Sequence, residues 1–424
     1  MIVILAAFYG LGLILATNRP LQFVLYYILA STKFLGFIDP AQFIVGGIEL
    51  GYFGLNLIAI FGIFFKKGWT IWPKHTQVIF FLIILMILFG ILRPILNNYS
   101  SIKQAVIASK DAWFYSIFLY LIVYYDNLDL QKIMKFIKFI SFYFTTIYLL
   151  FFIMPAIIPP HYYHGSHIRT FFPTYISLSI FFFLIELKMN DNKNYKTYLL
   201  IGYQMIGLVL AEHSNLTVMT LFCGALYLFA FDKNLRLKRE NIARILSYTV
   251  FFVAMALIFI NGLYDGIVDK IQSIVNSEDL ALRTRDLYNE FRWKAINDEP
   301  VFGYGYIHQS SNLMAAFKLA GGNAFMERFT VIDSGYVDLL IKYGYLGTGI
   351  ILGVMTWYFS FGFFNKYKNH ITLAMSLFLV QYLAMNYTWS VYTFSHGIIP
   401  GAIAFYIIIM YQDLGETEEN IILE

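Results

Sequence analysis

The sequence predicts an all-α integral membrane protein, a polytopic bundle of about 12–13 transmembrane helices with one large external loop. Of its 424 residues, 59% are hydrophobic and only 13% are charged, whereas soluble domains carry about 25% charged residues. The apolar residues gather in runs long enough to cross about 30 Å of hydrocarbon. Aromatic residues make up 19% of the chain, as expected where side chains face lipid and its interfaces.

Thirteen apolar runs are candidates for the spans. The first lacks a basic leader and a small-residue cleavage site, so we expect a retained span rather than a signal peptide. The first two runs could form one broken element, which leaves twelve and thirteen spans both open. The runs cover residues 2–16, 20–37, 41–65, 76–93, 103–125, 133–157, 172–187, 197–211, 216–231, 246–262, 345–364, 370–388 and 395–411.

Lysine and arginine are concentrated in every second loop, and such loops face the cytoplasm. The basic residues are Lys66, Lys67, Lys74, Lys132, Lys135, Lys138, Lys188, Lys193, Lys196, Lys233, Arg236, Lys238, Arg239, Arg244, Lys366 and Lys368. The alternate loops at 155–171, 212–215 and 389–395 contain one basic residue, Arg169. The acidic C-terminal tail is then cytoplasmic, while the side of the N-terminus depends on the span count.

Three parts follow from this pattern. Residues 1–262 form the N-terminal transmembrane bundle, and residues 263–333 form a polar extracytoplasmic loop. Residues 334–424 contain an amphipathic entry helix over 334–343, the closing spans and a short cytoplasmic tail. A loop as long as 263–333 is usually functional.

Arginines gather on the predicted outer side. Arg169 precedes one span, and Arg283, Arg285 and Arg292 lie in the large loop. Arginine stays charged and binds phosphate through a planar fork, so the group suits a lipid-linked diphosphate. The alternative is ordinary loop charge, solvated or paired with nearby carboxylates.

Lys110 and Asp111 interrupt an otherwise apolar run, and Glu49 raises the same question in the third run. A charge at a helix centre costs about 2.5–3.5 kcal/mol, so such residues usually face a bundle interior or a polar cavity. Adjacent helical residues do not face each other, which predicts different neighbours for Lys110 and Asp111. Lys110 is therefore a candidate substrate-binding residue, with snorkelling at the outer interface as the alternative.

No metal site or cofactor is expected. His161, His164 and His167 have helical spacing, but two prolines precede them and Gly165 interrupts them. We therefore interpret this segment as a polar interfacial loop. The sequence also lacks a D-x-D pair that would hold a metal against a nucleotide sugar, and it lacks a P-loop.

Asp333 directly precedes the amphipathic stretch. Asp is a preferred helix N-cap residue, which is the simpler interpretation. It could also act as a general base at the membrane surface, and the two roles are compatible.

Three segments together resemble the O-antigen ligase and Wzy-type polysaccharide polymerase superfamily. They are Arg169-Thr-Phe-Phe-Pro173, then Arg285-Asp-Leu-Tyr288 with Pro300-Val-Phe-Gly303-Tyr-Gly305, and Asp333-Ser-Gly-Tyr336 with Gly344-Tyr-Leu-Gly347. The resemblance covers roughly residues 165–390. The chain departs from the family pattern at Ser214-Asn215, where Ser-Arg is frequent, and at Tyr288, where Trp is common. Asp333 replaces the histidine of the ligases, as in polymerases.

The resemblance implies a GT-C-like glycosyltransferase in the bacterial cytoplasmic membrane that polymerises oligosaccharide repeat units carried on undecaprenyl diphosphate. Arg285 and Arg169 would stabilise the departing diphosphate, supported by Arg283 and Arg292. Asp333 would accept the proton of the attacking hydroxyl. It also implies the lipid bilayer, a chain-length regulator and a flippase as partners, and no nucleic acid. Tyr304, Tyr306 and His308 could contact sugar, and the alternative there is a plain turn with interfacial tyrosines. Tyr288 and Tyr336 are further candidate substrate-binding residues.

Three alternatives remain. An O-antigen-ligase-type enzyme would transfer finished polymer to a different acceptor. A flippase or transporter of lipid-linked oligosaccharides would often show internal repeats, and the sequence shows none. A structural or sensory membrane protein would bind a ligand at the large loop without turnover.

Overall fold

The structure is a computed structural model of the chain. It describes residues 2–35, 44–45, 48–66, 74–154, 172–189, 195–211, 213–231, 235, 292–315, 334–364, 369–387, 391 and 395–414.

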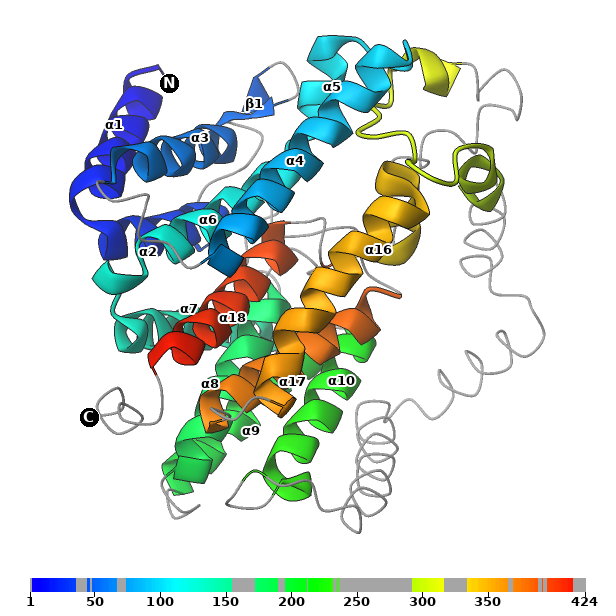
Figure 1. Cartoon of the computed structure of the whole chain (residues 1–424). Coiled ribbons are helices and arrows are strands. Elements are labelled where there is room, and N and C mark those ends of the chain that lie inside the picture. The colour runs from blue at the N-terminus through cyan, green and yellow to red at the C-terminus, as the bar shows by residue number, and fades with distance from the viewer. Residues whose placement is uncertain are drawn as a thin grey trace.

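Helices make up almost all of the described residues, which confirms the all-α fold (Figure 1). The first half contains α1 (Ile2–Asn18), α2 (Pro20–Ser31), α3 (Leu50–Phe65), α4 (Lys74–Leu96), α5 (Ile102–Ala108), α6 (Tyr115–Val123), α7 (Leu130–Ile153) and α8 (Pro173–Met189). The second half contains α9 (Tyr195–Leu210), α10 (Ser214–Ala225), α16 (Gly335–Phe364), α17 (His370–Met385) and α18 (Ser395–Leu414). Shorter elements are the 3-10 helices η3 (Ala112–Phe114) and η4 (Tyr125–Asn127), the π-helix η7 (Leu226–Ala230) and the antiparallel pair β1 (Ile44–Val45) and β2 (Ile48–Glu49).

The chain is a membrane protein with several helices apolar enough to span a bilayer. Among the described residues, Gln77–Leu96, Leu130–Ile153 and Gly335–Phe364 are long enough to cross alone. Ile102–Ala108 and Ala112–Val123 form a fourth candidate, bent by 56°. Twelve of the thirteen predicted runs contain a described helix, and the run at 246–262 lies outside the described residues. Several helices are shorter than a full span, so the count of 12–13 stays a prediction.

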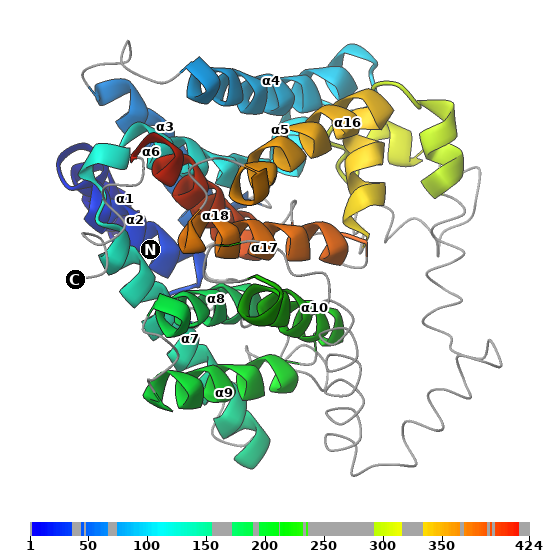
Figure 2. The same cartoon turned by 60° about the horizontal axis from the view of Figure 1, so that its bottom comes forward.

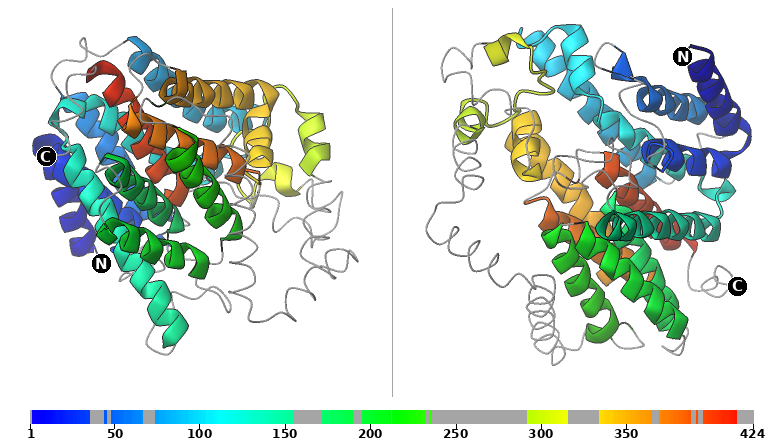
Figure 3. Two further views of the ribbon diagram at one scale, coloured as in Figure 1. Left: turned by 90° about the horizontal axis from the view of Figure 1, so that it is seen from below. Right: turned by 180° about the vertical axis from the view of Figure 1, so that it is seen from behind.

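The helices are arranged in layers around α17 and α18. Figure 2 shows these two helices between α4 and α16 on one side and α7 to α10 on the other, and Figure 3 shows the same order from below and behind. Large aromatic side chains fill the interior, and Phe23, Tyr120, Phe181 and Tyr382 are each completely buried. Lipid is as apolar as the protein interior, so helix association in a membrane depends on van der Waals packing rather than on the hydrophobic effect. Large buried rings supply much of that packing energy.

One end of the bundle is held by lysines that belong to the predicted cytoplasmic loops. The Lys66 ammonium donates a hydrogen bond to the carbonyl of Val123, where α6 ends. Lys188 donates to the carbonyls of Tyr227 (2.7 Å) and Phe231 (3.0 Å), where the π-helix ends. Helix ends leave carbonyls without intrahelical partners, so these lysines stabilise the ends of two helices.

The loops predicted to be external meet at the opposite end. The Leu313 N–H donates to the Tyr99 carbonyl (3.2 Å), and the Gln104 side chain donates to the Ser310 carbonyl (2.6 Å). The Gly335 N–H donates to the Asn386 carbonyl (2.8 Å). The loop after α4, the described part of the large loop and the ends of α16 and α17 therefore form one connected surface.

Candidate functional site

The entry helix and the following span are parts of one broken helix, α16. Gly344 has φ 61° and ψ −170°, which is not helical, and separates residues 335–343 from residues 345–364. The break falls between the predicted amphipathic stretch at 334–343 and the predicted span that begins at 345. The break interrupts backbone hydrogen bonding on both sides, and buried backbone groups need partners.

Residues 300–306, here called the glycine loop, supply those partners. Tyr304 and Gly305 donate from their N–H groups to the carbonyls of Ile341 (2.7 Å) and Lys342 (2.9 Å). In the other direction, the N–H groups of Tyr345 and Leu346 donate to the carbonyls of Pro300 (2.7 Å) and Val301 (3.2 Å). The glycine loop therefore completes the hydrogen bonding of α16 at the break.

Glycine is required where the backbone of the glycine loop touches the backbone of α16. Gly303 has φ +64°, and a Cβ atom there would lie 2.6 Å from both the Gly344 nitrogen and the Ile341 oxygen. A Cβ atom on Gly344 would lie 2.4 Å from the carbonyl of Val301. Glycine adopts positive φ without steric cost and permits such close approach, which explains the glycines at both positions.

A missing backbone hydrogen bond in α4 provides the anchor for the other side of the glycine loop. Pro94 lies inside α4 and has no N–H, so the carbonyl of Gly90 lacks its normal helical donor. The Tyr306 N–H donates to that carbonyl instead (2.7 Å). A Cβ atom on Gly90 would lie 2.4 Å from the Tyr306 ring. The spacing of Gly90 and Pro94 is visible in the sequence and is a signal that could have indicated this contact.

Arg93, to which no sequence motif pointed, fastens the glycine loop to α4. Its Nη2 atom forms an ion pair with Glu299 (2.7 Å), and its Nε atom donates to the Gly303 carbonyl (3.1 Å). The Tyr99 hydroxyl donates to the other oxygen of Glu299 (2.7 Å). Arg93 precedes the helix-breaking Pro94 at the end of a span, and its partner lies more than 200 positions away, so local patterns did not reveal it.

We expect Arg93→Ala to loosen the glycine loop, because it removes the ion pair with Glu299 and the hydrogen bond to Gly303. Hydrogen bonds to charged groups contribute about 1.5–3 kcal/mol each, and a loss of about 2–4 kcal/mol in unfolding free energy is expected. Thermal unfolding of the detergent-purified protein measures this. Arg93→Ala combined with Glu299→Gln should cost clearly less than the sum of the single changes, and additive losses would show that the two side chains do not interact.

Two predicted contact residues, Tyr304 and His308, lie on or beside this framework. Tyr304 is 3% exposed and its ring lies 5.5 Å from that of Tyr99. Burial, with help from Asp298 and Glu299, raises the pKa of the Tyr304 phenol, so it stays protonated at neutral pH. His308 is half-buried, with Nδ1 2.8 Å from the Ser310 hydroxyl. The Tyr304 and His308 sugar contacts remain predictions.

The other described candidates are Tyr336, Arg292 and Lys110. The Tyr336 hydroxyl donates to the carbonyl of Leu383 (2.6 Å), which ties α16 to α17. Arg292 is only 5% exposed and lies in the helical stretch described over 292–298. Lys110 is exposed between α5 and η3. Their substrate contacts are untested and stay predictions.

Asp333, Arg285, Arg169, Arg283 and Tyr288 lie outside the described residues, as does the histidine run at 161–167. Glu49 belongs to β2, immediately before α3, rather than to a span. That position corrects the expectation that the third span carries an internal charge. Searched over the described part of the chain, His, Cys, Asp and Glu form no group of three that could hold a metal ion.

Asn386, at the end of α17, is a second residue that the sequence did not single out. It is completely buried, and neither atom of its amide group makes a hydrogen bond. The other amide side chains buried among the described residues each make at least one; they are Asn56, Gln204, Asn369 and Gln381. A Cβ atom on Gly335 would lie 1.8 Å from the Asn386 Oδ1 atom, so the glycine after Ser334 makes room for this amide.

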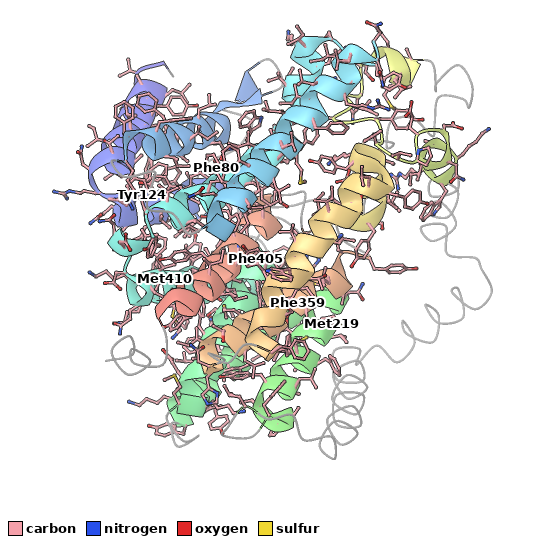
Figure 4. The ribbon with its side chains drawn as sticks, in the orientation of Figure 1. Phe80, Tyr124, Met219, Phe359, Phe405 and Met410 are labelled. Carbon is pink, nitrogen blue, oxygen red and sulfur yellow. The ribbon has the colours of Figure 1, made fainter. Side chains whose placement is uncertain are left out.

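An apolar cavity opens beside the glycine loop, between α4, the bend after α5, α16 and α18. The centre of a water-sized sphere can move through about 110 Å³ of it. Phe405 of α18 lines the cavity and lies behind the space between α4 and α16 in Figure 4. Asp111 and Lys342 are the charged residues among its described lining. Asp111 therefore faces the cavity while Lys110 is exposed, which confirms that these neighbours point in different directions.

Residues 200–352 match the family described as O-antigen ligase. This part of the chain is similar to the domain of that family. It extends from α9 into the second half of α16, and so includes the glycine loop, the break at Gly344 and the whole predicted external loop. The match confirms the resemblance at the level of the ligase and polymerase superfamily. No curated protein and no solved structure matches the chain.

An O-antigen ligase family domain implies lipid-linked polysaccharide substrates in a membrane. The structure adds a rigid backbone junction at one end of the bundle and an apolar cavity next to it. The helix that follows Asp333 in the chain, α16, is interrupted at this junction.

Proposed function

We propose that the protein polymerises undecaprenyl-diphosphate-linked oligosaccharide repeat units into a surface polysaccharide at the outer face of the cytoplasmic membrane. The observation that carries the proposal is the family match over residues 200–352, which contains the large loop and the glycine loop. The apolar cavity beside the glycine loop supports a substrate with a lipid part.

The chemistry needs few groups from the protein. A hydroxyl oxygen of the acceptor sugar forms a bond to the anomeric carbon of the donor, and the bond from that carbon to the lipid diphosphate breaks with its electron pair. Asp333 accepts the hydroxyl proton. Arg285 and Arg169, supported by Arg283 and Arg292, stabilise the negative charge on the departing diphosphate. Cations that are already in place stabilise a transition state most where its negative charge develops.

A ligase is the second candidate, because the matched family is described as O-antigen ligase. A ligase would use the same donor chemistry with a different acceptor. Asp333 occupies the position of the ligase histidine in the motif, and this favours a polymerase.

The test uses the purified protein with a synthetic undecaprenyl-diphosphate oligosaccharide repeat unit and no nucleotide. A polymerase should release undecaprenyl diphosphate and give a ladder of products in steps of one repeat unit on a gel. A ligase should give no ladder from this substrate alone and should form product only when another acceptor is added. The absence of any product with several repeat units and several acceptors would contradict both.

A further inference from the structure

The tip of the glycine loop is apolar and exposed. Val301 and Phe302 are 51% and 43% exposed, whereas Tyr304 and Tyr306, later in the same loop, are buried. The tip belongs to the predicted external loop, where its side chains would meet water. A contiguous exposed apolar patch usually marks a surface that contacts a partner or a membrane, so the surroundings of the tip decide which of these it meets.

The tip adjoins the lipid-facing sides of two candidate spans, α4 and α16. The Phe302 ring lies 6.0 Å from the Phe89 ring of α4, and the Val301 carbonyl accepts from the Leu346 N–H of α16 (3.2 Å). Both helices carry exposed apolar side chains at helical spacing, which is the pattern of a face turned toward lipid. These side chains are Leu85, Leu88, Leu92 and Leu96 of α4 and Leu346, Ile350 and Trp357 of α16.

The length of the spans gives the level of the tip in the bilayer. Residues 345–364, the part of α16 after the break, extend about 30 Å, which matches a hydrocarbon core of about 30 Å. The glycine loop is bonded to the first residues of this part. On α4, Phe89 lies seven positions before the last residue, Leu96, or about 10 Å along the helix, which exceeds a headgroup layer of about 5–8 Å. The tip is therefore level with the edge of the hydrocarbon.

The backbone of the glycine loop suits this environment. Irregular backbone is tolerated at membrane depth only where its polar groups are bonded to protein. The Gly303 N–H donates to the Glu299 carbonyl (3.1 Å), and the Gly303 carbonyl accepts from Arg93 (3.1 Å). The next three N–H groups donate to α16 and α4, as described above. A loop surrounded by water would not need its backbone satisfied in this way.

The charge beside the tip is neutralised within the protein. The Arg93 guanidinium lies 5.7 Å from the centre of the Phe302 ring and forms its ion pair with Glu299 (2.7 Å). Charged residues near a bilayer are usually paired in this way. Tyr345, which is 52% exposed beside the loop, is of the type that collects at the membrane–water interface.

We propose that Val301 and Phe302 insert into the outer leaflet of the bilayer and anchor the large external loop to the membrane surface. The partner of this surface is lipid, because the tip continues the lipid-facing sides of α4 and α16 at the level where the hydrocarbon ends. The anchor holds the glycine loop, and with it the break in α16, at the membrane surface. This inference does not depend on which reaction the protein catalyses.

The experiment measures where a nitroxide spin label at position 301 lies when the full-length protein is in liposomes. Val301→Cys suits the label, because the Val301 side chain is exposed and only its carbonyl is bonded to α16. Oxygen concentrates among lipid chains, whereas a water-soluble nickel complex stays outside them. The label at 301 should collide more often with oxygen than with the nickel complex, and Phe302→Cys should give the same result.

Two matched positions calibrate the measurement. Leu88→Cys, on the exposed face of α4, should report lipid, and Asn312→Cys, exposed just after the glycine loop, should report water. Melting temperatures close to that of the wild type show that each variant is folded. Labels at 301 and 302 that match Asn312→Cys would place the tip in water and overturn the inference. Labels reached by neither reagent would also overturn it, because a protein surface, such as a second copy of the chain, would then cover the tip.

Discussion

Gly344→Ala should destabilise the protein by about 2–6 kcal/mol and abolish polymer formation. Gly344 has φ 61° and ψ −170°, a region used almost only by glycine, where another residue costs about 1–3 kcal/mol. Its new methyl group would lie 2.4 Å from the Val301 carbonyl, and such overpacking typically costs about 1–3 kcal/mol more. Neither backbone can retreat, because the glycine loop is bonded to both sides of the break.

Gly349→Ala is the matched control, five positions further along α16. A Cβ atom there meets nothing within 4 Å, and Ala is favoured over Gly in helices by about 0.5–1 kcal/mol. This variant should unfold at the same temperature as the wild type or higher, and it should form polymer. Thermal unfolding in detergent, followed by intrinsic fluorescence, measures both variants. Equal melting temperatures would show that the junction does not depend on glycine at 344.

Asp333→Asn should lower the rate of glycosyl transfer by about 10²–10⁴-fold without loss of stability. Positioned general bases typically contribute this factor, and an amide cannot accept the proton. α16 begins at Gly335, and the Ser334 carbonyl accepts its first helical hydrogen bond, from the Asp338 N–H (3.0 Å), so Ser334 rather than Asp333 stands at the N-cap position. Asp333→Ala should therefore lower the rate to a similar extent and leave the melting temperature unchanged.

Asp129→Asn is the control for the replacement of a carboxylate by an amide. Asp129 caps α7 at the opposite end of the bundle, where its side chain accepts from the Lys132 N–H (3.0 Å). This variant should keep wild-type rate and stability. The measurement is the release of undecaprenyl diphosphate at saturating substrate. Normal turnover by Asp333→Asn would show that Asp333 is not the general base.

The helices were predictable from the sequence because membrane spans depend on local composition. Each predicted run within the described residues contains a helix, and even the division of α16 at Gly344 matched the change from an amphipathic to an apolar pattern. Span lengths were less predictable. The helix ends depend on tertiary contacts, such as the Lys66 bond to the Val123 carbonyl.

The framework of the site was predicted only in part. The glycines at 303 and 344 stand in segments that resemble family motifs. Arg93 of α4, which donates to the Gly303 carbonyl, stands in no such segment. Arg93 and Glu299 meet across more than 200 positions, and Asn386 meets Gly335 through the packing of α17 against α16. No periodicity within one segment encodes such contacts. The roles of Arg169, Arg285 and Asp333 rest on the motifs and stay predictions.

The orientation of the bundle decides whether the end that carries the glycine loop faces outward, as the proposed reaction requires. Asn312 and Asn127 are both exposed, the first just after the glycine loop and the second in η4 at the lysine-rich end. The natural cysteine, Cys223, is buried and gives little background. A membrane-impermeant maleimide should label Asn312→Cys in cells with an intact cytoplasmic membrane, and Asn127→Cys only after permeabilisation. Labelling in the reverse pattern would place the glycine loop in the cytoplasm and contradict the proposed site of glycosyl transfer.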